Sequence, residues 1–222
     1  MTTPPQAGTL SSAVIRRTVK LAEIPAPTGH EDTRRERVRS WWRQDGWTDV
    51  RTDDVGNLWA RVRPGDGPAV VLAAHLDTVF DDTVDHQVRQ EGTRLCGHSV
   101  GDDSVGVAAL SALGTRAPNE QITVGIEELG RRPAGELEQA HPLAAAAAAA
   151  LRAAGWRARF TAASTDANAA HAAGVPAIAI GVTTGGGEHT PDEWIDTSPL
   201  SAGLGCAAAT IAGWEGGGGD RP

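Results

Sequence analysis

The chain has 222 residues, of which 40% are hydrophobic and 22% are charged, and its formal net charge is −8 at pH 7. This length and composition are sufficient for the core of one α/β domain, and the acidic balance argues against general binding to nucleic acids or anionic membranes. The two cysteines, Cys96 and Cys206, form no CxxC pair and indicate no disulfide framework. Because the N-terminus lacks a signal-peptide pattern and no stretch of about twenty residues is apolar throughout, we expect a cytoplasmic protein.

Apolar residues at helical spacing, and the residues that interrupt them, predict the helices. The first helix ends at the Pro-rich stretch 24–29, and the second, with Trp41 and Trp42 facing fully or partly inward, ends at Gly46. The predicted helices span residues 11–23, 31–45, 141–154, 166–173 and 199–212, and a loop–helix unit covers 102–113.

Two continuous apolar runs, 69–74 and 175–182, are typical of strands that are buried on both faces of a sheet. Shorter strands are predicted at 50–52, 58–62, 121–129 and 157–162. Strands that alternate with helices favour a three-layer α/β/α domain with a mainly parallel central sheet, in which the two apolar runs are central strands. We therefore expect one catalytic-type domain over residues 1–214 and a flexible Gly-rich tail over residues 215–222.

His75 and Asp77 directly follow the first apolar run. A central strand of an α/β sheet delivers its next residues to the carboxyl edge, where such proteins place their sites. A spacing of two puts both side chains on one face of an extended segment, so that Asp77 can hold the second ring nitrogen of His75, as metal-binding histidines require. A polar strand end without chemistry is the alternative interpretation.

Three other segments carry carboxylates or an imidazole. Asp102 and Asp103 lie in a Gly-rich turn before a helix, where a carboxylate either caps the helix or binds metal ions. Glu127 and Glu128 end a predicted strand, and such a pair either divides the roles of base and ligand or lies in water at the surface. His189 follows a Gly-rich loop after the second apolar run, where a histidine either is a metal ligand or has no catalytic role.

The chain contains four blocks in the order AAHLDTV, GHSVGDDSVGVAAL, STDANAAHAAGVPAIAIG and GGGEHTPDEWID. Together they resemble the co-catalytic zinc exopeptidase family, which includes peptidase T, carboxypeptidase G, succinyl-diaminopimelate desuccinylase and aminoacylase. The resemblance covers roughly residues 11–212. It implies a metal-dependent hydrolase with two zinc ions per site, or cobalt or manganese in their place, that cleaves amide bonds in small peptides or acyl-amino acids.

At the matching positions, the resemblance implies that His75 binds one zinc ion, that His189 binds the other and that Asp102 bridges both. It also implies that Asp77 is the carboxylate that orients His75. Two metal ions close together lower the pKa of a shared water and stabilise a tetrahedral intermediate. A glutamate then takes the proton of that water and passes it to the leaving amine.

Asp166 and Asn168 belong to the third block. The resemblance implies a supporting or substrate-facing role for this block, without metal binding. The alternative interpretation is that Ser164 or Asp166 caps the short helix that follows.

The chain departs from the family between Asp102 and His141. In one interpretation Glu127 is the catalytic base and Glu128 the neighbouring metal ligand. In the other, residues 124–135 resemble the segment where the family's chain returns from its lid domain. Both interpretations leave no room for a lid, which in the family supplies a dimer surface, so the sequence predicts no oligomeric state. The alternative function is therefore an incomplete relative without a lid, with weak or no catalysis, as a metal-binding or structural remnant.

Overall fold

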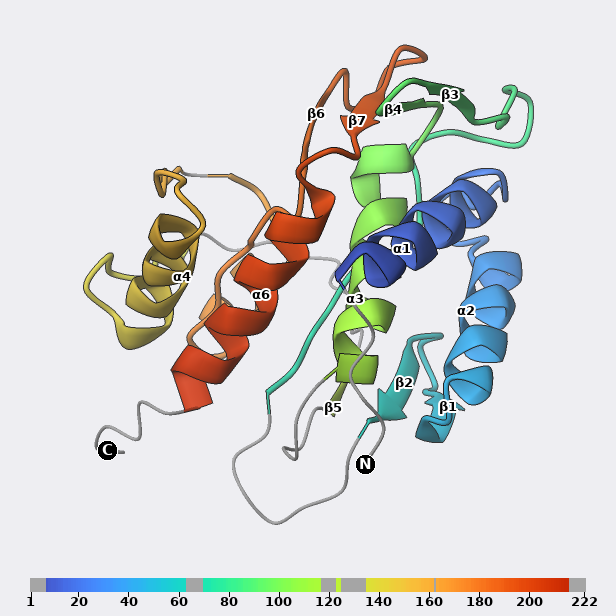
Figure 1. Cartoon of the computed structure of the whole chain (residues 1–222). Coiled ribbons are helices and arrows are strands. Elements are labelled where there is room, and N and C mark those ends of the chain that lie inside the picture. Colours follow the sequence, from blue (N-terminus) through green and yellow to red (C-terminus); the bar gives the residue numbers. More distant parts are fainter. Residues whose placement is uncertain (1–6, 63–69, 117–122, 125–134, 162, 216–222) are drawn as a thin grey trace. The chain divides into compact units, whose positions relative to one another are not determined.

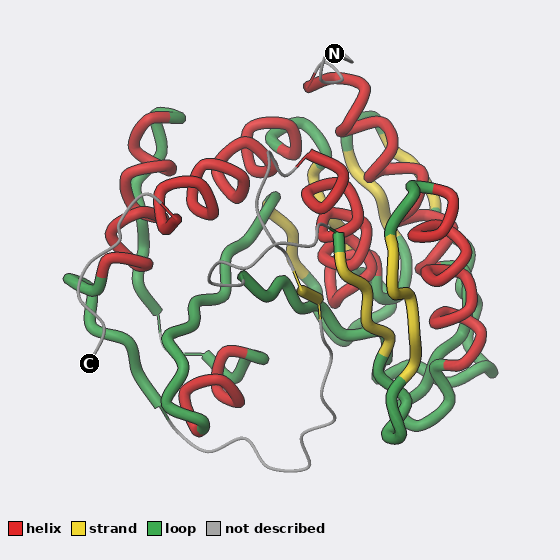
Figure 2. The backbone as a smooth tube through the Cα atoms, turned by 90° about the horizontal axis from the view of Figure 1, so that it is seen from below, coloured by secondary structure: helices red, strands yellow, loops and turns green. Residues whose placement is uncertain are grey.

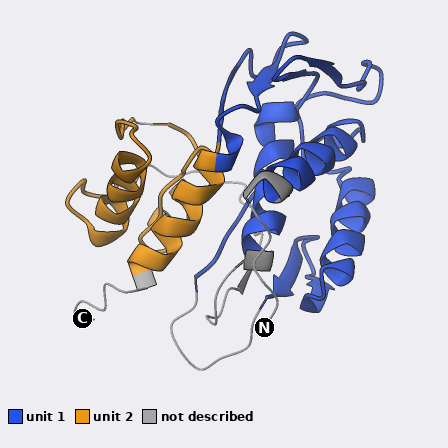
Figure 3. Ribbon diagram, viewed as in Figure 1, with its two compact units in different colours: residues 1–128, 183–201 blue, residues 129–182, 202–222 orange. Residues whose placement is uncertain are grey.

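The computed structural model describes residues 7–62, 70–116, 123–124, 135–161 and 163–215. The chain forms two compact units, of which unit 1 comprises residues 1–128 and 183–201 and unit 2 comprises residues 129–182 and 202–222 (Figure 3). The expectation of one catalytic-type domain over residues 1–214 stays a prediction, and residues 216–222 of the expected tail lie outside the described residues. Among the described helices, none has the length and apolar character needed to cross a membrane.

Unit 1 contains the helices α1 (Ala7–Ala22), α2 (Asp32–Gln44) and α3 (Val105–Arg116). Helix α1 packs against α3, and α2 packs against the strands β1 and β2 (Figure 1). The inward face of α2 is formed by Arg34, Val38, Trp41 and Trp42, which share one side of the helix because their spacing follows its period. Trp42 also donates from Nε1 to Ser111 Oγ of α3 at 2.9 Å, so that its polar atom is satisfied inside the core.

The strands of unit 1 form two antiparallel sheets, which Figure 2 shows in yellow between longer loops. The first has the order β1-β2-β5, with β1 (Thr48–Thr52), β2 (Leu58–Arg61) and β5 (Thr123–Val124). The second has the order β3-β4-β7-β6, with β3 (Arg89–Glu91), β4 (Arg94–Cys96), β7 (Trp194–Asp196) and β6 (Thr184–Gly186). The second sheet therefore joins segments that lie about a hundred residues apart in the sequence, and it positions the loops that carry the candidate site.

The prediction of mixed helices and strands is confirmed, but the described residues form no mainly parallel central sheet. Every strand pair among the described residues is antiparallel. Pro27 and Thr78 form an isolated parallel bridge outside the strands. The apolar runs contain no strand within residues 70–74 and 175–182. Val71 is 55% exposed and Val175 is 53% exposed, so neither run is buried on both faces as its composition predicted.

Unit 2 contains α4 (Pro142–Ala153), α5 (Ala167–Ala172) and all but the first two residues of α6 (Leu200–Glu215). His141 caps α4 by accepting a hydrogen bond from the backbone N–H of Leu143 at 3.2 Å, and Gly155, with a φ of 80°, ends this helix as predicted. The buried Cys206 of α6 donates from Sγ to the carbonyl of Ala150 in α4 at 3.6 Å. The predicted strand at 157–162 is absent from its described residues, 157–161.

Candidate functional site

Four polar side chains of unit 1 meet at one place, and we call them the quartet: His75, Asp77, Asp102 and His189. His75 Nε2 lies 2.9 Å from Asp102 Oδ1, and His189 Nε2 lies 2.6 Å from Asp102 Oδ2. On its other side, His75 Nδ1 lies 3.1 Å from Asp77 Oδ1. Each imidazole therefore faces a different oxygen of the same carboxylate, and one imidazole is held by a second carboxylate.

The quartet is brought together by three loops. His75 and Asp77 follow the run 70–74, and the backbone N–H of His75 donates to Asp103 Oδ2 at 3.3 Å. Asp102 lies in the irregular turn η1 (Val100–Ser104) that precedes α3, and its peptide bond with Asp103 is cis. His189 lies in the loop between β6 and β7 with a φ of 64°, a conformation that its neighbours in the tight turn must maintain.

The Pro-rich segment after α1 supports the Asp77 side of the quartet. Thr28 donates from Oγ1 to Asp77 Oδ2 at 2.7 Å, and the backbone N–H of Thr78 donates to the carbonyl of Ala26 at 2.9 Å. Both oxygens of Asp77 are thus engaged, one by Thr28 and one by His75. Asp77 therefore fixes the orientation of the His75 ring through its Nδ1 atom.

The charges of His75, Asp77 and Asp102 stabilise one another. Burial by itself would lower the pKa of His75, but the hydrogen bonds with Asp102 and Asp77 and the nearby charge of Asp103 raise the pKa to about 11. The hydrogen bond with His75 lowers the pKa of Asp77 to about 2 although desolvation opposes this shift. The same histidine lowers the pKa of Asp102, again against desolvation. His75 is therefore an imidazolium between two carboxylates at neutral pH when no metal ion is bound.

Arg34 connects the two segments that carry the quartet's first three members. Its buried guanidinium donates to the carbonyl of Ile24 at 2.7 Å, to the carbonyl of Leu76 at 3.0 Å and to Ser99 Oγ at 2.8 Å. Desolvation lowers the pKa of Arg34 to about 10, whereas the charges of Asp77 and Glu193 act in the opposite direction. Arg34 thus joins the residue between His75 and Asp77 to the loop that leads to Asp102.

Glu193 is a second buried charged residue, and it binds the loop that carries Asp102. It is 1% exposed, and its carboxylate accepts backbone N–H groups from Ser99, Gly101 and Asp102. Desolvation raises the pKa of Glu193, and the three N–H groups act against that rise. The sequence-based interpretation assigned no role to Arg34 or Glu193. The signal for Arg34 was its place on the apolar face of α2.

The four other predicted site residues fall into two pairs. Glu127 and Glu128 are outside the described residues. Asp166 and Asn168 belong to unit 2, where Asp166 occupies the N-cap position of α5 without a capping hydrogen bond from its side chain. Asn168 Oδ1 instead accepts the backbone N–H of Thr165 at 2.9 Å, which closes the turn before this helix. A substrate-facing role for the two residues stays a prediction.

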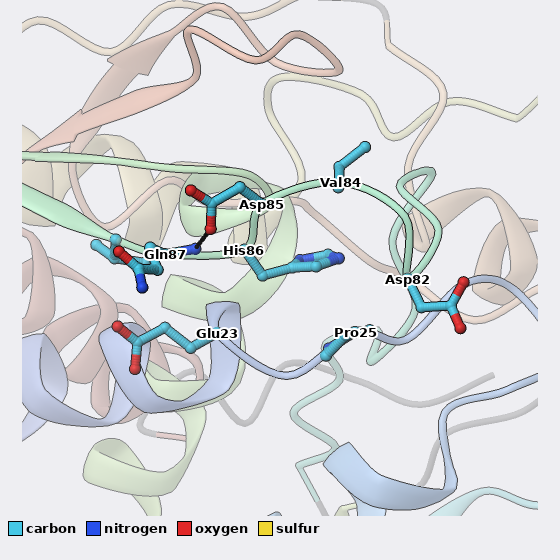
Figure 4. Close-up of a pocket in the computed structure, with 8 residues that line it drawn as sticks. Glu23, Pro25, Asp82, Val84, Asp85, His86 and Gln87 are labelled. Atoms are coloured by element: carbon cyan, nitrogen blue, oxygen red, sulfur yellow. Dashed lines mark hydrogen bonds between the residues drawn. The ribbon is translucent and has the colours of Figure 1, made fainter.

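A cavity of about 510 Å³ lies beside the loop 81–88, and no member of the quartet lines it (Figure 4). Two buried histidines hold the loop that forms part of its wall. His86 donates from Nε2 to the carbonyl of Asp81, and His98 donates from Nδ1 to the carbonyl of Asp85, both at 2.7 Å. These buried histidines therefore stabilise a loop that borders the cavity. The residues that line the cavity include no member of the quartet.

The donor types of the quartet fit a divalent metal ion such as zinc. Zinc binds imidazole nitrogens and carboxylate oxygens, and a metal-binding histidine commonly has its other ring nitrogen held by a carboxylate, as Asp77 holds His75. Within the described residues, no group of three or more His, Cys, Asp or Glu side chains is spaced to hold a metal ion. Both imidazoles instead approach Asp102 at hydrogen-bonding distance.

No protein-family model and no curated protein matches the chain. Among solved structures, the aminopeptidase PepT from Bacillus cereus ATCC 10987 matches with a TM-score of 0.74 and 12% identity, over 92% of this chain and 99% of that chain. The aminoacylhistidine dipeptidase from Vibrio alginolyticus matches with a TM-score of 0.44 and 25% identity, over 57% of this chain. A tripeptidase from Staphylococcus aureus subsp. aureus Mu50 matches with a TM-score of 0.43 and 20% identity, over 52% of this chain.

The match to PepT shows that the chain has the fold of that aminopeptidase. The resemblance to co-catalytic zinc exopeptidases in the sequence is therefore confirmed at the level of the fold. The chain spans 30% of the length of the dipeptidase and 35% of the length of the tripeptidase.

Proposed function

We propose that the chain is a metal-dependent hydrolase that cleaves amide bonds in small peptides or acyl-amino acids with a metal-activated water. The observation that carries this proposal is the placement of His75 and His189 on the two oxygens of Asp102. A carboxylate that faces one imidazole with each oxygen has the donor arrangement of a bridge between two metal ions. The four sequence blocks and the fold of an aminopeptidase support the same function.

The proposed metal ions are zinc, with cobalt or manganese as alternatives. His75 and His189 would each hold one ion and Asp102 would contact both, and Asp77 would orient His75. Bound zinc supplies Lewis acidity, which makes water nucleophilic at neutral pH and polarises a carbonyl group. Glu127 is the proposed general base and Glu128 the proposed additional ligand, on the strength of the sequence alone.

The bonds of Asp77 explain how the chain prepares His75 for this role. Because Asp77 engages Nδ1 of His75, the ring presents Nε2 toward Asp102. Thr28 restrains the second oxygen of Asp77, so that this carboxylate cannot rotate away without losing a hydrogen bond. An oriented ring has less freedom to lose on binding an ion, which favours metal affinity.

Metal binding tests the proposal directly. The chain would be stripped with a chelator and titrated with zinc, and bound metal would be measured by mass spectrometry. We expect His75→Ala and His189→Ala to lower affinity by more than about 100-fold, and Asp77→Ala by about 10–100-fold, since removal of an outer-shell partner typically has that effect. The matched control is His30→Ala, which removes an exposed imidazole and should leave zinc binding unchanged.

Unchanged zinc occupancy in both His75→Ala and His189→Ala would overturn the metal site. Activity would be measured on a panel of dipeptides, tripeptides and acyl-amino acids, with zinc or cobalt bound. We expect hydrolysis that the chelator abolishes and that Glu127→Gln reduces by about 10²–10⁴-fold with the fold intact, as loss of a general base does. Metal binding without any turnover would contradict the hydrolase and support the incomplete relative.

A further inference from the structure

The carboxylate of Glu193 holds the backbone of the loop that carries Asp102. Its Oε1 accepts the N–H of Gly101 at 2.6 Å and the N–H of Asp102 at 2.9 Å, and its Oε2 accepts the N–H of Ser99 at 2.9 Å. Hydrogen bonds to a charged acceptor are about twice as strong as those between neutral groups. Both oxygens of one buried side chain thus restrain three residues of the loop, including a quartet member.

The main chain of Glu193 holds the loop that carries His189. The N–H of Glu193 donates to the carbonyl of Thr190 at 3.2 Å, and the N–H of Thr190 donates to the carbonyl of Gly187 at 3.0 Å, so that His189 lies inside a closed turn. On its other side, the carbonyl of Glu193 accepts the N–H of Gly97 at 3.0 Å, just beyond the ladder of β4 and β7. One residue is therefore bound to both loops, by its backbone and by its side chain.

The packing around this carboxylate leaves little space for another arrangement. A Cβ atom added at Gly101 would lie 2.9 Å from Glu193 Oε1 and 3.3 Å from Ile195 Cγ2. Arg34 donates to Ser99 Oγ at 2.8 Å and so restrains the same loop. The Asp102 loop consequently has two buried charged anchors, and Glu193 is the one that also contacts the His189 turn.

We infer that Glu193 is the positioning residue that sets the separation of Asp102 from His189. This inference rests on the proposed function, because that separation defines where an ion between the two side chains binds. The hydrogen bonds of Glu193 join backbone groups of the two loops and of Gly97. Glu193 acts by fixing the backbone of the two loops before any metal ion arrives, which lowers the cost of ordering the ligands.

Glu193→Gln tests the inference with almost no change in size. An amide has one acceptor oxygen, so its NH₂ group must oppose either the N–H of Ser99 or those of Gly101 and Asp102. We expect zinc affinity to fall by about 10–100-fold, and we expect the visible spectrum of the cobalt-loaded chain to change because the ligands are differently placed. The matched control is Glu188→Gln, which makes the same chemical change at an exposed residue of the same loop and should change neither quantity.

Hydrogen exchange in the metal-free chain separates positioning from metal chemistry. The amides of Gly101 and Asp102 should exchange at least about tenfold faster in Glu193→Gln, because protection requires an acceptor, while amides in the middle of α2 keep their protection. If Glu193→Gln does not fold, Gly101→Ala crowds the same oxygen with the charge intact, and it should give the same changes to a smaller extent.

The two proposals fail in different ways. If the unaltered chain binds no zinc, the proposed function is overturned, and the exchange of the Gly101 and Asp102 amides alone decides the positioning role. If Glu193→Gln and Gly101→Ala bind zinc with unaltered affinity and keep the two amides protected, the positioning role is overturned while the metal site stands.

Discussion

Two carboxylates of unit 1 each accept hydrogen bonds from several N–H groups. Asp53 lies in the turn between β1 and β2, and Glu193 binds the backbone of the loop that carries Asp102. Asp53 accepts the backbone N–H groups of Val55 and Asn57, the amide of the Asn57 side chain and the indole N–H of Trp59. Glu193 accepts three backbone N–H groups of the Asp102 loop. The partners of Asp53 lie within six residues of it, whereas those of Glu193 lie more than 90 residues away.

The pKa values of the two groups shift in opposite directions for a physical reason. Desolvation raises the pKa of Asp53, but the hydrogen bonds from Trp59 and the backbone outweigh it and the pKa is lowered. For Glu193 desolvation is the larger effect, and the pKa is raised. At Asp53 these hydrogen bonds therefore complete a local hairpin near the surface. At Glu193 they offset the desolvation cost of a buried carboxylate that joins distant segments.

The largest effect on stability is expected at the long-range anchors. Arg34→Ala leaves the carbonyls of Ile24 and Leu76 and the hydroxyl of Ser99 without a donor from this guanidinium. We expect the free energy of unfolding in urea to fall by about 3 kcal/mol or more, since each buried group left without a partner costs about 1–3 kcal/mol. Arg37→Ala, at an exposed position of the same helix, should change it by less than about 0.5 kcal/mol. Similar losses for both variants would show that Arg34 is not an anchor.

A glycine next to the quartet gives a second, smaller effect. A Cβ atom at Gly106 would overlap the carboxylate of Asp103, which accepts the backbone N–H of His75. Gly106→Ala should therefore lower the free energy of unfolding by about 1–3 kcal/mol, as overpacking does. Gly205→Ala is the matched control, because its Cβ atom would meet nothing within 4 Å in helix α6. It should stabilise the chain by up to about 1 kcal/mol through helix propensity, and thermal unfolding would contradict this account if both variants moved in the same direction.

The elements that the sequence predicted well depend on neighbouring residues. Helices α1, α2, α4 and α6 and the β1–β2 hairpin follow from periodicity and from glycines that end a run, and Gly46 and Gly155 have the positive φ values that such ends require. The runs 70–74 and 175–182 were wrongly predicted as central strands. Apolar composition indicates burial, but it does not show which other segment will pair with a run through backbone hydrogen bonds. The strands β3, β4, β6 and β7 were missed, since each has only three residues.

Site residues that belong to a sequence motif were predictable, whereas residues that only the fold brings to the site were not. The structure brings together His75, Asp77, Asp102 and His189, which the sequence blocks singled out, although their roles as ligands stay predictions. Glu193 was hidden because its side-chain partners lie more than 90 residues before it in the sequence. Its faint signal is a carboxylate directly before Trp194 and the buried Ile195 at the start of a strand.

The local carboxylate should matter less than the buried anchors. Asp53→Asn keeps one oxygen for the N–H groups of Val55 and Asn57, but its NH₂ group cannot accept from the Asn57 amide and the Trp59 indole. We expect the free energy of unfolding to fall by about 1 kcal/mol, the net value of typical hydrogen bonds at a partly solvated site. Asp54→Asn, at the exposed neighbour, should have no measurable effect. A loss as large as that of Arg34→Ala would remove the distinction between local and long-range anchors.

The smallest effect concerns pH, and its sign follows from the lowered pKa of Asp53. A folded-state pKa below the unfolded value of about 3.9 means that the charged form stabilises the fold. That contribution is fully present above about pH 5 and is lost as the pH falls through the folded-state pKa. The difference in unfolding free energy between the unaltered chain and Asp53→Asn should therefore be constant from about pH 5 to pH 7 and narrow below about pH 3.9. Urea unfolding of both chains at several pH values measures it, and a difference that widens toward low pH would show that the carboxylate is not the stabilising form in this turn.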